Sequence, residues 1–278
     1  AANGGKLTAA TDLDIEYTKP EYHYNANLYA KRVYNGWGHA EPETELRFGP
    51  NIKDWPEMPA LTDDLLVKVC SYITDSVTTT DELIPSGETS SYRSNPERLS
   101  EFALSRRDPQ YVSRSKEVRQ IERDREAGKA LPEEVLNVYA ALTKAGVKND
   151  PAHTGSTIFA NMPGDGSARE QAASCQRVMG ASANFAKQYA TKRYRSNCIN
   201  WGMTPFLVES PEVFALGDYI FIPGLRQAVL GNKASFSAYV VKADGTVTEF
   251  PVSTGALTEP ERQIIADGCL INYYRNNQ

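Results

Sequence analysis

The chain has 278 residues, of which 41% are hydrophobic and 23% charged, and its formal net charge is −5. This composition is typical of a soluble globular protein, and an acidic chain does not favour nucleic-acid binding, which needs a basic face. No apolar run is long enough to span a bilayer, so no membrane partner is expected.

The cysteines are scattered along the chain and form no CxxC pair. This usage is typical of a reduced protein in the cytoplasm, or in the mitochondrion of a eukaryote. The three histidines are equally dispersed, so the sequence predicts no metal site held by this chain alone. The residues concerned are Cys70, Cys175, Cys198, Cys269, His23, His39 and His153.

Residues 1–60 differ from the rest of the chain. The stretch EYTKPEYHYNANLYAKRVYNGWG (16–38) holds five tyrosines and follows neither the helical nor the strand period. It predicts an extended arm, docked on a surface because floppy segments are usually poor in aromatics. The chain also begins without Met and without a secretion signal, and we interpret it as a piece of a longer protein. The predicted organisation is an interdomain linker or arm over 1–60 and one α/β domain over 61–278.

Regular elements follow the arm. LLVKVCSYI (65–73) alternates as a strand, residues 78–95 read as a polar loop, and residues 108–129 as a partly helical charged stretch. LPEEVLNVYAALTKAG (131–146) has the apolar spacing of a helix and ends at Gly146.

The second half alternates strands and helices. Strands are predicted at 155–163, 182–185, 217–224 and 236–241, and helices at 171–180 and 186–197. The basic run KRYR (192–195) is expected near a helix C-terminus, which attracts cations. Asp244–Gly245 predicts a hairpin turn, and Thr258 with Glu261 a capping box that opens a last helix ending near Gly268.

The corner GDGSARE (164–170) joins a predicted strand to a predicted helix. Glycines let the backbone approach a bound group, and a helix N-terminus offers unpaired N–H groups to an anion. Arg169 adds a forked cation suited to a carboxylate or phosphate, and Ser167 lies in the same positive environment. The alternative is structural: Ser167 caps the helix, and Arg169 pairs with Glu170 or Asp165.

Two segments here resemble the aconitase family of cluster-dependent hydro-lyases. GDGSAREQAASCQRVMG is similar to the family's GxGSSREHAA segment, and TTDELIPSGETSSYR (79–93) to its TTDHI loop, with Asp81 and Arg93 twelve residues apart. DWPEMPALTDDLLVKV and the C-terminal ALTEPERQIIADGCLINYYRN resemble the flanking strand and closing helix. The resemblance covers residues 50–278 and implies a mixed β/β/α swivelling domain of the aconitase C-terminal type.

By the resemblance, Ser167 matches the serine that removes a proton next to a carboxylate, and Asp81 a carboxylate that supports proton handling. Arg93 and Arg169 match arginines that grip substrate carboxylates, with position 168 facing the substrate. The substrate implied is a hydroxy di- or tricarboxylic acid. The family's [4Fe–4S] cluster would be held by cluster-bearing domains N-terminal to this sequence and not by this chain.

The sequence departs from the family at two positions. Ala168 replaces a second serine, and Glu82 replaces the histidine after the loop aspartate. One oxyanion donor fewer weakens transition-state stabilisation by about 2–4 kcal/mol. Two alternatives therefore stay open: a catalytically silent carboxylate- or phosphate-binding regulatory domain, and a relative of the isopropylmalate isomerase small subunit.

Overall fold

The computed structural model describes residues 3–14, 16–33 and 35–277. It divides the chain into two units, Ala1–Arg47 and Phe48–Gln278. The first holds a short 3-10 helix, Ala10–Asp12, and α1 (Ala26–Ala30), and none of its described residues is buried. The arm predicted over 1–60 includes residues 1, 2, 15 and 34, which lie outside the described residues. Its docking stays a prediction.

Residues 48–60, which the sequence assigned to the arm, belong to the second unit. The ring of Trp55 packs against that of Trp201 with their centroids 4.3 Å apart. The Met58 carbonyl accepts a hydrogen bond from Asn272, and the Pro59 carbonyl accepts one from Arg177. This segment is therefore fixed to the second unit by aromatic packing and by its own carbonyl groups.

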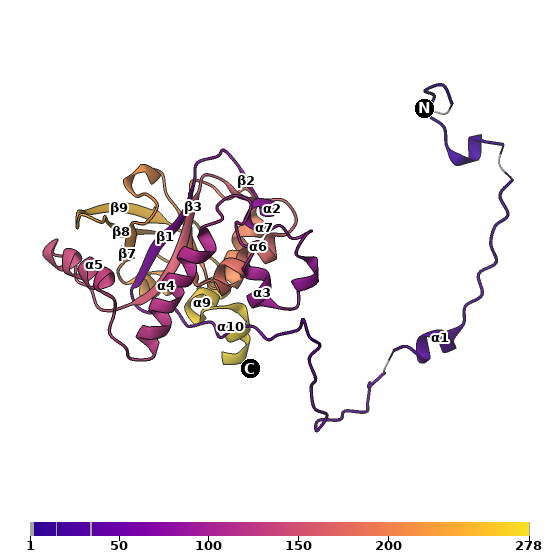
Figure 1. Cartoon of the computed structure of the whole chain (residues 1–278), viewed down its shortest axis with the longest axis horizontal. Helices are drawn as coiled ribbons and strands as arrows, with labels where there is room; N and C mark the ends of the chain where they lie inside the picture. The colour runs from indigo at the N-terminus through magenta and orange to yellow at the C-terminus, as the bar shows by residue number, and fades with distance from the viewer. Residues whose placement is uncertain (1–2, 15, 34, 278) are drawn as a thin grey trace. The chain divides into compact units, whose positions relative to one another are not determined.

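The second unit is built around a closed barrel in which parallel and antiparallel strands share one sheet (Figure 1). Its order is β1-β3-β5-β6-β9-β8-β7, and β7 pairs back onto β1. The first four of these strands run parallel, and the pairs from β6 through β9, β8 and β7 to β1 are antiparallel. The strands are β1 (Leu65–Ile73), β3 (His153–Ala160), β5 (Ala181–Ala186), β6 (Thr204–Leu207), β7 (Tyr219–Ile222), β8 (Ser235–Val241) and β9 (Val247–Ser253).

Alternate side chains of the strands fill the barrel. Leu65, Val67 and Val69 of β1 point inward with Phe185 and Phe206, whose rings stack 5.0 Å apart. Leu66 and Cys70, which point outward from β1, are also buried, because helices cover the parallel strands. A register shift at Val69/Ser71 marks a bulge in β1.

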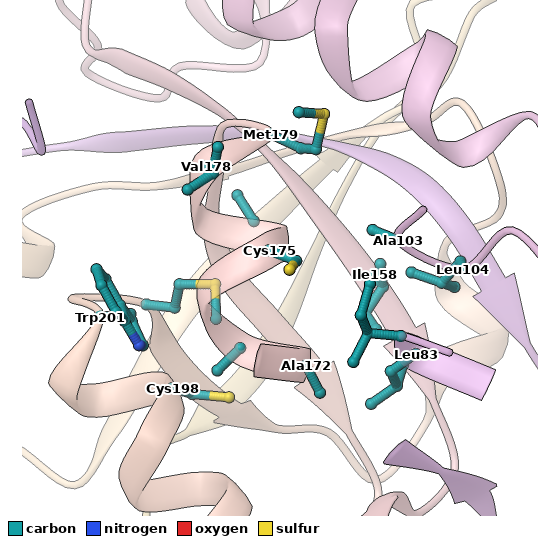
Figure 2. Close-up of a cluster of buried hydrophobic side chains, with 14 of the residues drawn as sticks. Leu83, Ala103, Leu104, Ile158, Ala172, Cys175, Val178, Met179, Cys198 and Trp201 are labelled. Atoms are coloured by element: carbon teal, nitrogen blue, oxygen red, sulfur yellow. The ribbon is translucent and has the colours of Figure 1, made fainter. Parts of the chain in front are cut away.

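Helices enclose the outer face of the parallel half. α4 (Tyr111–Glu126) packs on β1 and β3, and α6 (Arg169–Val178) packs against α3 (Pro96–Ser100) and α7 (Lys192–Asn200). Figure 2 shows α6 at the centre of this outer core, with Ala172, Cys175 and Val178 turned toward other buried side chains. The other helices of this unit are α2 (Thr80–Leu83), α5 (Glu133–Lys144), α8 (Leu225–Leu230), α9 (Glu259–Asp267) and α10 (Leu270–Asn276), with 3-10 helices at Ser90–Tyr92 and Pro211–Val213.

The predicted mixed α/β fold is confirmed, as are most of its long elements. Two local predictions are wrong. The loop 78–95 contains a short strand β2 (Thr78–Thr79) and α2, because Thr79 and Glu82 form a capping box. The run KRYR begins α7 instead of ending it, because the Thr191 hydroxyl accepts a hydrogen bond from the Tyr194 N–H and caps the helix there.

Candidate functional site

The corner between β3 and α6 has a backbone that only glycine tolerates well. The short strand β4 (Pro163–Asp165) is followed by Gly166, and both Gly164 (φ +97°) and Gly166 (φ +128°) have left-handed φ values. A Cβ atom on Gly164 would lie 2.3 Å from the Tyr194 ring, and one on Gly166 would lie 2.2 Å from Thr80 Oγ1. The two glycines therefore let two other segments approach the corner closely.

These contacts bring the two sequence motifs together. β2 pairs with β4 in parallel, with Thr78 opposite Pro163 and Thr79 opposite Asp165. Thr80 then contacts Gly166, and α2 packs against the start of α6. Asp81 is the next residue, so the loop that carries it lies directly beside the turn that carries Ser167.

Ser167 does not act as the helix cap. The N-cap of α6 is Ala168, which has no side-chain oxygen to accept a hydrogen bond. The Ser167 side chain is exposed and makes no hydrogen bond to the described residues. The N–H groups of the first turn of α6 also have no acceptor in the described part of the chain, and a helix cannot satisfy them itself. The corner thus presents unused donors beside an unused hydroxyl.

Arg169 does not form the ion pair that the structural alternative requires. Neither Glu170 nor Asp165 contacts it, because Glu170 accepts a hydrogen bond from the Trp201 indole N–H at 3.1 Å and Asp165 is exposed. Its Nε atom is buried without a hydrogen-bond partner among the described residues. A buried donor without a partner costs free energy, and a bound acceptor such as a carboxylate would remove this cost.

Asp81 lies in the first turn of α2 and carries an ion pair to Arg106, which also pairs with Glu88. Glu82, the departure from the family motif, has a local role: its Oε2 accepts hydrogen bonds from the Thr79 N–H at 2.7 Å and the Thr79 hydroxyl at 2.8 Å. Sequence reasoning missed Arg106, and the only signal for it was the basic pair RR at 106–107.

Arg93 follows the 3-10 helix Ser90–Tyr92 and is exposed, with no acidic partner in the described chain. Its segment is held by Tyr92, whose ring stacks on Phe102 at 5.7 Å, and it leads into α3, which packs on α6. The structure therefore joins the Asp81 loop directly to the corner, and α3 joins the Arg93 segment to it.

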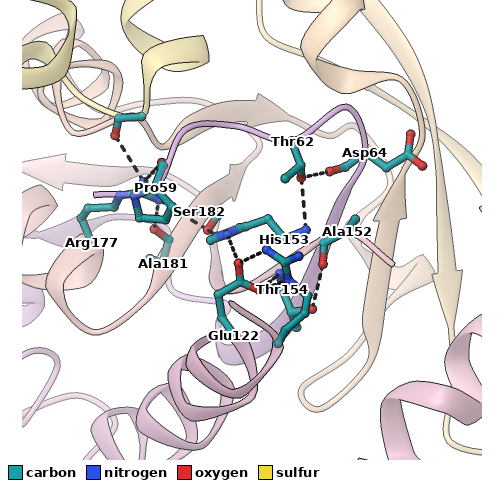
Figure 3. A network of polar contacts seen from close by, with 12 residues as sticks. Pro59, Thr62, Asp64, Glu122, Ala152, His153, Thr154, Arg177, Ala181 and Ser182 are labelled. Carbon is teal, nitrogen blue, oxygen red and sulfur yellow. Dashed lines mark hydrogen bonds and ion pairs between the residues drawn. The ribbon is translucent and has the colours of Figure 1, made fainter. Parts of the chain in front are cut away.

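A buried polar network lies at the other end of α6 (Figure 3). The Glu122 carboxylate contacts His153 Nδ1 at 2.7 Å, and His153 Nε2 contacts Ser182 Oγ at 2.6 Å. Arg177, in the last turn of α6, donates to the carbonyls of Pro59, Ala181 and Gly268. The network borders a cavity of about 100 Å³. Its contacts join α4 to β3 and β5, and they join α6 to the segment before β1 and to Gly268 after α9. Sequence reasoning assigned none of these residues.

The cysteines do not form a metal-binding set. All four are buried, and burial raises the pKa of Cys70 to about 11 and that of Cys198 to about 12. Burial also raises the pKa of Cys175, so this thiol stays protonated and offers no reactive thiolate. Within residues 3–14, 16–33 and 35–277, no three His, Cys, Asp or Glu side chains are grouped to hold a metal ion.

The fold and the corner define a mixed α/β barrel domain with a glycine turn that carries an exposed serine and a half-buried arginine without an acidic partner among the described residues. No family model and no curated protein matches the chain. The structure is similar to the crystal structure of 3-isopropylmalate dehydratase (LeuD) from Methanocaldococcus jannaschii, with a TM-score of 0.46 and 19% identity over 76% of this chain and 95% of that one. A similarity this low does not assign a family. Among the described residues, no helix has the length and apolar character needed to cross a membrane.

Proposed function

We propose that this chain is the C-terminal swivelling domain of an aconitase-like hydro-lyase that acts on a hydroxy di- or tricarboxylic acid. It would supply the serine base and the arginines that bind the substrate. The observation that carries the proposal is the state of the corner: Ser167 and Arg169 have no partners among the residues that the structure describes, and the Asp81 loop lies against the same turn. The motif resemblance in the sequence predicts this arrangement.

Ser167 Oγ is the group that would take the proton from the carbon next to a carboxylate. A serine hydroxyl is a weak base, and its deprotonated form needs nearby positive charge. The first-turn N–H groups of α6 and the Arg169 guanidinium provide that charge at the same turn. The negative charge that develops on the substrate carboxylate as the proton leaves would be met by Arg169 as well.

Arg93 and Asp81 complete the proposed site. Arg93, which is exposed and has no acidic partner in the described part of the chain, would bind a second carboxylate of the substrate. Asp81 would accept or return a proton near the substrate hydroxyl. Asp165, Gly166 and Ser167 are all exposed, so the corner is a half-site that another domain would have to cover to exclude water.

The residues of this chain do not fit an iron–sulfur cluster. Its cysteine thiols are buried and separate, and a cluster needs several thiolates at one place. A cluster would therefore be supplied by cluster-bearing domains outside this sequence. No residue of this chain is given the role of helping the substrate hydroxyl to leave.

The test is turnover by the assembly that carries the cluster. Ser167→Ala should lower the dehydration rate by about 10²–10⁴-fold, the contribution typical of a positioned base, and leave substrate affinity nearly unchanged. Arg169→Gln should weaken substrate binding. Ser210→Ala, at an exposed serine without a side-chain cap bond, is the matched control. Unchanged turnover in Ser167→Ala would exclude the base role.

The second candidate function is a catalytically silent carboxylate- or phosphate-binding domain. It is favoured by Ala168, which leaves the corner with one hydroxyl where the family motif has two. Under this alternative, only changes of the arginines matter, and they act on binding. The Ser167→Ala measurement therefore separates the two functions.

A further inference from the structure

Arg106 is held in place by an unusual turn. Leu104 has a left-handed φ of +53° although it is a fully buried, branched residue. Its N–H donates to the Leu83 carbonyl at 2.9 Å, and its own carbonyl accepts the Asp108 N–H at 2.7 Å. Such a backbone persists only where its surroundings enforce it. The turn is therefore fixed to the end of α2, and Arg106, two residues on, is brought to the Asp81 loop.

The Arg106 guanidinium bridges two acids, Asp81 and Glu88. The three side chains are exposed by 44%, 57% and 69%, so water reaches all of them. Ion pairs at such exposure contribute little to stability, and a dissolved acid can exchange with one partner. Stabilisation of the fold therefore does not explain why Arg106 bridges Asp81 and Glu88.

The cations around the corner differ in how they are paired. Arg93 and Arg169 have no acidic partner in the described chain, whereas Arg106 pairs with both Asp81 and Glu88. The side chains of these three residues together carry a formal charge of −1. Glu88 is the more exposed of the two acids and lies in the same segment as Arg93. A guanidinium binds carboxylates through a two-pronged fork, and the Glu88 carboxylate has the chemistry of a substrate carboxylate.

We propose that Arg106 is a third carboxylate-binding group of the corner and that Glu88 occupies its fork until an acid displaces it. Asp81 stays paired with the guanidinium, and this ion pair positions the Asp81 carboxylate. This inference rests on the proposed function and extends it: acids with two or more carboxylates are selected over monocarboxylic acids by exchange with Glu88.

The test is calorimetric titration of the 278-residue chain with citrate and, separately, with acetate. Glu88→Gln should tighten citrate binding about threefold, because citrate then has no competitor for the Arg106 guanidinium. Arg106→Gln should weaken citrate binding about tenfold, because its charge-assisted contacts with citrate are lost. Acetate affinity should stay the same in both variants. The matched control is Arg107→Gln, at the neighbouring arginine, which pairs with Asp75 and with neither Asp81 nor Glu88, and it should leave both affinities unchanged.

The ratio of citrate to acetate affinity separates binding from structure, because a loss of folding lowers both affinities together. If Arg169→Gln weakens citrate binding while Glu88→Gln and Arg106→Gln do not change that ratio, Arg169 keeps its proposed role in substrate binding and Arg106 is excluded from the site. If the unchanged chain binds no citrate, this inference is overturned, and the proposed function is decided separately by turnover of Ser167→Ala in the assembly that carries the cluster.

Discussion

Glu122 is the residue whose charge contributes most clearly to stability, and Glu122→Gln removes that charge with little change of shape. The side chain is 8% exposed. Burial alone would raise its pKa, but contacts with Arg125, His153 and the Thr154 N–H outweigh burial and lower the pKa from 4.5 to about 2. Arg125 donates through two nitrogens, at 2.8 and 2.7 Å.

The sign of the pH dependence follows from this pKa. Because the carboxylate is favoured in the folded state, its contribution is complete above the unfolded pKa and is lost as the pH falls from about 4.5 to about 2. At about 1.4 kcal/mol per pH unit, the full contribution is about 3 kcal/mol, of which about 2 kcal/mol is lost by pH 3. The free-energy difference between the chain and Glu122→Gln should shrink by that amount.

The assay is urea unfolding followed by circular dichroism at pH 7 and pH 3. Glu126→Gln, on the same helix but exposed, is the control and should show no such change. A difference between the chain and Glu122→Gln that is equal at both pH values would refute the reasoning, because it would mean that the lost stability comes from shape and not from charge.

Two further changes test the corner and its support. Gly166→Ala should destabilise the chain by about 3 kcal/mol, through its left-handed φ and contact with Thr80, while Gly217→Ala, whose φ is also positive but whose surroundings are open, should cost only about 1 kcal/mol; equal losses would remove the contact from the explanation. Tyr194→Phe should cost about 2–3 kcal/mol in thermal or urea unfolding, whereas exposed Tyr274→Phe should cost nearly nothing. The Tyr194 hydroxyl accepts hydrogen bonds from two buried amides, those of Gln176 and Asn184. A neutral Tyr194→Phe would show that these amides find other acceptors.

The sequence predicts those elements whose signals are local. The alternation of β1, the apolar stripe of α5 and the capping box of α9 each lie within one short segment, and the structure confirms them. β6 was missed, because TPFL is four residues long and contains a proline. Barrel closure through β7 and β1 was also missed, since strand pairing across the chain leaves no mark on either strand alone.

The candidate site divides in the same way. The serine, glycines and arginine of the corner lie within one six-residue stretch, 164–169, so their proximity could be predicted. The neighbours of the corner could not: Arg106 reaches Asp81 through a folded loop, and Glu122 reaches His153 from 31 residues away. Chemistry that depends on residues brought together by packing becomes visible only in three dimensions.

Closure of the barrel restricts how any further domain can join this one. Strands β1, β3, β5, β7 and β8 each have a partner on both sides, so a neighbour cannot attach there by extending the sheet. The seam between β6 and β9 pairs only Leu207 with Ser253, so this seam and the small β2–β4 ribbon beside Ser167 keep open sides in the described chain. Whatever covers the corner must therefore dock through helices, loop tips, that seam or that ribbon.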